Sequence, residues 1–156
     1  MKRLLFLLLL GIAFTFGYLF PKTPQVIAKP VEVQKPVQLN EQILWSLIQN
    51  FRLENNRRPY IKNQVLCEIA TKRSGEIDEV FEHTIFHERY KNYPSVLGEN
   101  IAKTNMNELA VYNGWLNSLP HRAALEKQYT YSCIATKDQF AVQIFSNCEN
   151  GCPVVQ

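Results

Sequence analysis

The motif GENI at residues 98–101 and the motif WLNSLPHR at residues 115–122 decide the fold of this chain. The leading glycine of the first motif is typical of a turn, and the residues after it indicate a strand. Apolar residues at helical spacing predict a helix over about 105–118, which ends before Pro120. A short turn over 121–126 is expected to follow. The two motifs therefore place a strand and a helix end close together in the chain.

Downstream of these motifs the pattern changes to that of strands. Residues 129–136 and 139–146 are rich in aromatic and β-branched side chains and are separated by Lys137-Asp138, which predicts an antiparallel hairpin. The second strand carries apolar residues on both faces. Helices are therefore expected to cover both sides of the sheet.

Upstream of the motifs the sequence predicts two helices. Asn40 is a good N-cap for a helix that ends at residues 55–59, and Asn63 is one for a second helix that contains Cys67. The side chains expected to be buried on these two helices are Ile43, Leu44, Leu47, Ile48, Phe51, Leu66, Ile69 and Ala70. Residues 39–147 are thus predicted to form one domain of mixed α and β structure.

The first twenty residues differ from the rest and predict an export signal. Lys2 and Arg3 precede a mostly apolar run over residues 4–20, which as a helix would be roughly 25 Å long, near the lower limit for crossing a hydrocarbon core of about 30 Å. Signal peptides usually have shorter apolar regions, so the length favours a retained membrane anchor. Cleavage near Val26-Ile27-Ala28 is the alternative. In either case the basic residues before the run predict that the domain lies outside the cytoplasm.

Residues 21–38 contain four prolines and predict an extended linker between the anchor and the domain. Five of the seventeen Lys and Arg residues precede residue 39, and twelve basic and thirteen acidic residues remain from there on. The predicted domain is therefore close to neutral. Nucleic-acid binding needs a basic excess and is not expected.

Four cysteines, all beyond residue 66, agree with an oxidising compartment outside the cytoplasm. Three pairings are possible, and sequence alone does not choose among them. Our preferred set joins Cys67 to Cys133, a helix to a strand, and Cys148 to Cys152 in a disulfide-closed tail over residues 148–156. A zinc site made of cysteines is a weaker alternative, because paired CxxC spacings are absent.

His83 and His87 are four residues apart and would share one face of a helix. This spacing suggests the HExxH motif of zinc metalloproteases. Thr84, however, stands where that motif has its glutamate, and Phe86 stands where the inverted HxxEH form has one. A metalloprotease of this kind is therefore not expected.

Taken together and in order, these motifs resemble the CAP superfamily of cysteine-rich secretory proteins, antigen 5 and plant pathogenesis-related class 1 proteins, and in particular its bacterial branch. The residues that carry the resemblance are Asn50, Arg52, 66–70, 81–84, 98–101, 115–122 and 142–145. The resemblance implies an α+β fold, a three-layer α/β/α sandwich with a small central antiparallel sheet. It also implies a cleft lined by two histidines and one or two glutamates.

Within that cleft, Glu99 and His121 match the family pattern directly, and His83 matches by its sequence context, with His87 as the alternative. Ser118 stands where many relatives carry a second glutamate, so one acid is lost. His83, Glu99 and His121 could bind zinc or another divalent metal, or could form a hydrogen-bonded buried cluster without a ligand. The residues expected to contribute to the ligand-binding cleft are His83, Glu99, Asn100, Ser118 and His121.

Three functions are compatible with these observations. We favour an exported, membrane-tethered binding module for a lipid, a cell-wall glycan, a peptide or a protein. The first alternative is a metal-assisted hydrolase of cell-envelope polymers, with Glu99 as its base. The second is a structural, stalked domain without a ligand. No catalytic residue is assigned under the favoured function.

Overall fold

The computed structural model describes residues 37–91 and 97–147. The predicted anchor over 1–20, nearly all of the predicted linker, and the predicted Cys148–Cys152 bridge lie outside these residues. Within the described ranges, no helix is both long enough and apolar enough to cross a membrane. The helices and strands are α2 (Glu41–Glu54), β1 (Ile61–Lys62), α3 (Gln64–Glu76), α4 (Thr84–Tyr90), β2 (Gly98–Lys103), α5 (Glu108–Asn117), α6 (Leu119–Glu126), β3 (Tyr131–Lys137) and β4 (Phe140–Ser146).

The four strands form one sheet in the order β1-β3-β4-β2. The hairpin of β3 and β4 is antiparallel as predicted, and β2 pairs antiparallel with β4 along its whole length. The expectation of a purely antiparallel sheet was wrong, because β1 pairs in parallel with β3. Sequence neighbours can pair through a tight turn, but a parallel pair needs a long crossover, and here the chain from α3 to α6 supplies it.

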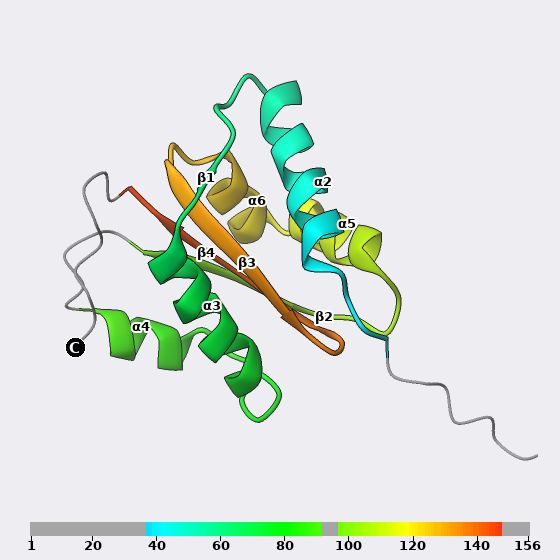
Figure 1. Ribbon diagram of the computed structural model, residues 1–156, viewed down its shortest axis with the longest axis vertical. Helices are drawn as coiled ribbons and strands as arrows, with labels where there is room; N and C mark the ends of the chain where they lie inside the picture. The colour runs from blue at the N-terminus through cyan, green and yellow to red at the C-terminus, as the bar shows by residue number, and fades with distance from the viewer. Residues whose placement is uncertain (1–36, 92–96, 148–156) are drawn as a thin grey trace, which may run out of the picture. The chain divides into compact units, whose positions relative to one another are not determined.

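Helices cover both faces of the sheet, as predicted from the two apolar faces of β4. α3 and α4 lie on one side, and α2, α5 and α6 lie on the other (Figure 1). The strand residues alternate between the two resulting cores: Ala141 and Phe145 pack with α2, α5 and α6, whereas Val142 and Ile144 pack with α3 and α4. The three-layer arrangement follows from this alternation.

The predicted helix starts are confirmed by their caps. The Asn40 side chain accepts hydrogen bonds from the backbone N–H groups of residues 42 and 43, and the Asn63 side chain accepts one from residue 66. Ile43, which was expected to be buried, is 50% exposed, and Leu109 on the predicted helix over 105–118 is 51% exposed. Each helix buries only the part of its apolar arc that faces the sheet or a neighbouring helix.

The segment over 121–126 is not a short turn but belongs to α6, a helix of eight residues. Pro120 was interpreted only as a stop signal for the preceding helix. It also lies in the first turn of α6, where a missing backbone N–H costs nothing. α5 and α6 are therefore consecutive helices that meet at Ser118.

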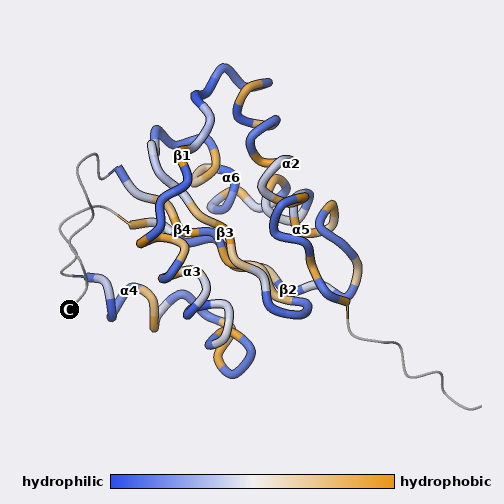
Figure 2. Tube along the Cα trace, viewed as in Figure 1, coloured by the Kyte–Doolittle hydropathy of each residue, from blue (hydrophilic) through white to orange (hydrophobic). Residues whose placement is uncertain are grey.

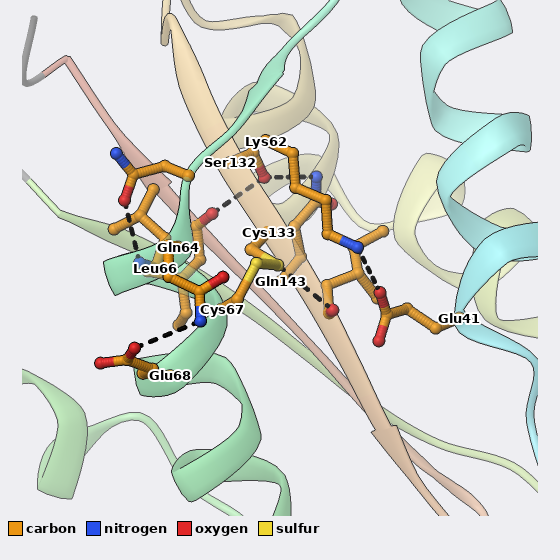
Figure 3. The surroundings of a disulfide bond; sticks show 12 residues. Glu41, Lys62, Gln64, Leu66, Cys67, Glu68, Ser132, Cys133 and Gln143 are labelled. Atoms are coloured by element: carbon orange, nitrogen blue, oxygen red, sulfur yellow. Dashed lines mark hydrogen bonds and ion pairs between the residues drawn. A yellow bond between two sulfur atoms is a disulfide. The ribbon is translucent and has the colours of Figure 1, made fainter.

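The disulfide between Cys67 of α3 and Cys133 of β3 is confirmed, with the two Cα atoms 4.9 Å apart (Figure 3). It fastens the helix to the centre of the sheet. Next to it, Lys62 at the end of β1 pairs with Glu41 at the start of α2, with 2.8 Å between nitrogen and oxygen. The disulfide and this ion pair connect the sheet to the helices on its two sides.

Candidate functional site

The predicted site residues come from three segments that meet at the β2 edge of the sheet. Glu99 and Asn100 are the second and third residues of β2, which has a neighbouring strand on one side only. His83 immediately precedes α4, and His121 lies in the first turns of α6. Because successive strand residues point to opposite faces, Glu99 faces α3 and α4 whereas Asn100 faces α6.

The Glu99 carboxylate is fully buried and both of its oxygens are occupied. Oε1 accepts from Nε of Arg73 at 2.7 Å, and Oε2 lies 2.8 Å from Nδ1 of His83. The Glu99 side chain is 0% exposed and that of Arg73 is 1% exposed. Arg73 also donates to the backbone carbonyl of Glu82, just before His83. One buried ion pair thus links α3, β2 and the start of α4.

Arg73 is a site residue that the sequence analysis missed. Arg73 was detectable in part from its position on α3. One face of this helix carries, at helical spacing, Leu66, Ile69, Ala70 and Arg73. The first three were already predicted to be buried. An arginine on a buried face needs hydrogen-bond acceptors for its guanidinium, and a carboxylate is the strongest of them. The sequence shows this need but does not identify Glu99, which is 26 residues away, as the partner.

The imidazole rings form a row with His83 in the middle. The centroid of the His83 ring is 5.9 Å from that of His121 and 6.3 Å from that of His87. His83 is the histidine in contact with Glu99, whereas His87 is exposed and lies farther along α4. The carboxylate therefore orients His83 through Nδ1, and the other nitrogen of that ring is not engaged by Glu99.

His121 is half-buried, and its pKa is held below the ordinary value for histidine. Burial is the main cause, since it disfavours the charged form, and the neighbouring His83 adds to the effect. The neutral imidazole is therefore favoured in the folded protein. A neutral histidine has one nitrogen that donates and one that accepts a hydrogen bond, which suits contact with a polar ligand group.

This shift predicts a pH dependence of stability. Well above about pH 6.5, His121 is neutral in both the folded and the unfolded protein. As the pH falls through this value, the unfolded chain takes up a proton before the folded protein does, because the pKa is lower in the folded protein. The free energy of unfolding therefore decreases with falling pH until the pKa of the folded protein is passed. Urea unfolding measures the free energy of unfolding of the wild type and of His121→Gln at pH values from 7.5 to 4.5, a range chosen to bracket about 6.5. His87→Gln, at the exposed histidine, is the control. Equal pH slopes in the wild type and His121→Gln would contradict the assignment.

Asn100 and Ser118 were both predicted to contribute to the ligand-binding cleft, but the structure gives them different roles. The Asn100 side chain is buried and donates from its amide nitrogen to the backbone carbonyl of His121 at 3.1 Å, so it holds the start of α6 against β2. Its amide oxygen has no hydrogen-bond partner among the described residues. Ser118 joins α5 to α6, and its side chain makes no capping hydrogen bond to α6.

A cavity of about 270 Å³ opens beside His121, between β2 and α5. Its volume is just below the range of roughly 300 to 1,000 Å³ that is usual for small-molecule sites, so it suits one group of a ligand rather than a whole large molecule. Ser118 and His121 lie at one end of it. The residues that line this cavity, called here the His121 pocket, are Ile101, Ala102, Lys103, Thr104, Ala110, Val111, Gly114, Trp115, Ser118 and His121.

The side chains in this arrangement do not fit a zinc centre. In residues 37–91 and 97–147 there is no group of three or more His, Cys, Asp or Glu side chains placed to hold a metal ion. Both Glu99 oxygens are already engaged, Oε1 by Arg73 and Oε2 by His83, so Glu99 would have to loosen at least one of these contacts to become a ligand. Metal binding by His83, Glu99 and His121 stays a prediction that requires such a rearrangement.

No protein-family model and no curated protein sequence matches the chain. The fold is similar to that of solved bacterial proteins. One is an extracellular protein containing a SCP domain from Bacillus anthracis, 25% identical with a TM-score of 0.62 over 69% of this chain and 40% of that one. Another is a cysteine-rich secretory protein from Staphylococcus aureus, 18% identical with a TM-score of 0.61 over 69% of this chain and 38% of that one.

A third similar structure is an outer surface protein from Borrelia burgdorferi, 22% identical with a TM-score of 0.61 over 74% of this chain and 100% of that one. The chain thus spans about two fifths of the length of the first two proteins and the whole of the third. These similarities agree with the motifs at residues 98–101 and 115–122. The described domain therefore shares its fold with these bacterial proteins, among them an SCP-domain protein and a cysteine-rich secretory protein.

Proposed function

We propose that this protein is an exported, membrane-tethered SCP-domain protein that binds an amphipathic ligand, with an apolar group in the His121 pocket. Export is supported by the N-terminal apolar segment, by the disulfide, and by the extracellular and outer-surface proteins to which the fold is similar. Tethering rests on the length of the N-terminal apolar segment. The His121 pocket is the observation that carries the binding function.

The walls of the His121 pocket favour an acyl-type group over a glycan. Val111 and Trp115 are buried apolar residues that line the pocket together with Ala102, and the Trp115 indole N–H is already used, because it donates to the backbone carbonyl of Ile101 at 3.1 Å. A sugar would bring hydroxyl groups that these walls do not satisfy. The polar side chains of Ser118 and His121 line the pocket as well, and His121 is half-buried.

Filling the pocket from Gly114 tests this proposal. A Cβ at Gly114 meets no atom within 4 Å, so Gly114→Leu introduces apolar bulk into the pocket without a backbone clash. Calorimetric titration of octanoate into the compact unit over residues 35–156 is expected to show binding that is weakened about tenfold or more in this variant, which corresponds to ~1.4 kcal/mol.

Gly75→Leu is the matched control for this experiment. Gly75 lies on α3, has equally open space around it, and does not line the pocket. It is expected to bind octanoate like the wild type. Equal affinities in all three proteins, or no octanoate binding in the wild type, would remove the proposed ligand class.

The proximity of the His83 and His121 rings is the observation that favours the metal-assisted hydrolase as a second candidate. It is weaker, because the carboxylate proposed as the base is bound by Arg73 and His83. Zinc titration of the wild type and of His121→Ala separates the two candidates. Micromolar zinc binding that the variant loses would favour the hydrolase, and its absence would favour the binding module.

A further inference from the structure

A second cavity, of about 490 Å³, lies at the opposite edge of the sheet from the histidines. It opens where the end of α2, the loop to β1 and the loop from α6 to β3 come together. β1 and β2 are the two outer strands of the sheet, so this cavity is separate from the His121 pocket. The loop that leaves α2 is strongly hydrophilic at first and becomes paler, nearer to neutral, towards β1 (Figure 2). The polar residues that line this cavity, called here the Arg58 cavity, are Arg52, Asn56, Arg58, Gln128 and Thr130.

Arg52 gives the Arg58 cavity a buried positive charge. Its side chain is in the core at 1% exposure, and its guanidinium lies 3.8 Å from the centroid of the Tyr60 ring. It donates to four backbone carbonyls, those of residues 58, 125, 127 and 129. Within residues 37–91 and 97–147, no Asp or Glu side chain forms an ion pair with it. The carbonyls satisfy its N–H groups but carry no full negative charge.

Arg58 adds a second positive charge and is available for a ligand. Its side chain is exposed and makes no hydrogen bond or ion pair within the part of the chain that the structure describes. The lining contains no acidic residue, and Asn56, Gln128 and Thr130 contribute amide and hydroxyl groups. Two guanidinium groups without a carboxylate, surrounded by neutral hydrogen-bonding groups, are the chemistry that recognises oxyanions.

We propose that the Arg58 cavity is an anion-binding site that takes one oxyanion group, a phosphate or a carboxylate. Arg58 supplies the direct ionic contact, and the side chains of Asn56, Gln128 and Thr130 supply hydrogen bonds. Arg52 stays fixed on its carbonyls and contributes the field of its charge. The site is independent of the ligand proposed for the His121 pocket, so either can fail without the other.

The full-length protein in a non-ionic detergent is titrated calorimetrically with inorganic phosphate and, separately, with acetate, each against sodium chloride at the same ionic strength. Phosphate binding alone assigns the site to phosphate groups, and acetate binding alone assigns it to carboxylates. Arg58→Gln is expected to weaken the binding about tenfold, since one charge-assisted contact is lost. This substitution keeps the backbone carbonyl of residue 58 that Arg52 uses, so the fold is retained.

Arg57→Gln is the matched control, because Arg57 is the adjacent arginine and does not line the cavity. It is expected to change the affinity by no more than about twofold, through its distant charge alone. Two results would overturn the proposal: neither anion binds the wild type beyond the chloride control, or Arg57→Gln weakens binding as much as Arg58→Gln. A thermal melt of each variant shows that it is folded before it is titrated.

Discussion

Arg73→Met is expected to lower the free energy of unfolding by about 3 to 5 kcal/mol, because it leaves the buried carboxylate of Glu99 without its counter-charge. The two side chains are 1% and 0% exposed, so solvent offers little compensation. Methionine keeps most of the apolar stem of the arginine, so lost packing adds little to the effect. Urea unfolding of the wild type and the variant at pH 7 measures the difference.

Arg89→Met is the control for this prediction. Arg89 also pairs with a glutamate, Glu76, at 2.6 Å, but its side chain is 36% exposed. Its loss is expected to cost less than about 1 kcal/mol, as for other exposed ion pairs. The double variant Arg73→Met/Glu99→Gln should lose less than the sum of the two single variants, because it removes both charges. Equal costs for Arg73→Met and Arg89→Met would contradict the buried pair as described.

Replacing both Cys67 and Cys133 by alanine is expected to cost about 4 kcal/mol. The disulfide closes a loop with a sequence separation of 66 residues, and the loss of that constraint raises the conformational entropy of the unfolded chain by this order of magnitude. The transition in urea should shift to lower concentration in the variant. Adding a reductant should shift the wild type towards the variant.

The reductant also provides the control for this second prediction. In the Cys67→Ala/Cys133→Ala variant the disulfide is already gone, so the reductant is expected to have a much smaller effect there. If the reductant destabilised the wild type and this variant equally, the stabilising bridge would have to involve other cysteines.

The parts of the fold that depend on neighbouring residues could be predicted from the sequence. Asn40 and Asn63 are helix caps, and the Lys137-Asp138 turn joins an antiparallel hairpin, because each of these features is decided within a few residues. The helices on both faces followed from the alternation in β4. The Cys67–Cys133 bridge was one of several possible pairings, preferred because it would join a helix to a strand.

The features that were missed depend on residues far apart in the chain. β1 has two residues, and its parallel pairing is decided by β3, about 70 residues later. Arg73 was recognisable as a buried position, but its partner on β2 was not. The same holds for Asn100, whose contact with the backbone of His121 joins two elements that no local pattern connects. Sequence motifs identified Glu99 and His121, and tertiary packing determined which other side chains surround them.

The most direct test of the account is to find where octanoate binds. Amide chemical-shift mapping on the isotope-labelled unit over residues 35–156 reports this residue by residue. We predict that the largest shifts lie along the His121 pocket, at residues 102 and 103 of β2 and the adjacent Thr104, at Gly114 of α5, and at Ser118 and His121. Shifts centred elsewhere, or no shifts at octanoate concentrations that saturate the calorimetric titration, would contradict the claim that this pocket is the ligand site.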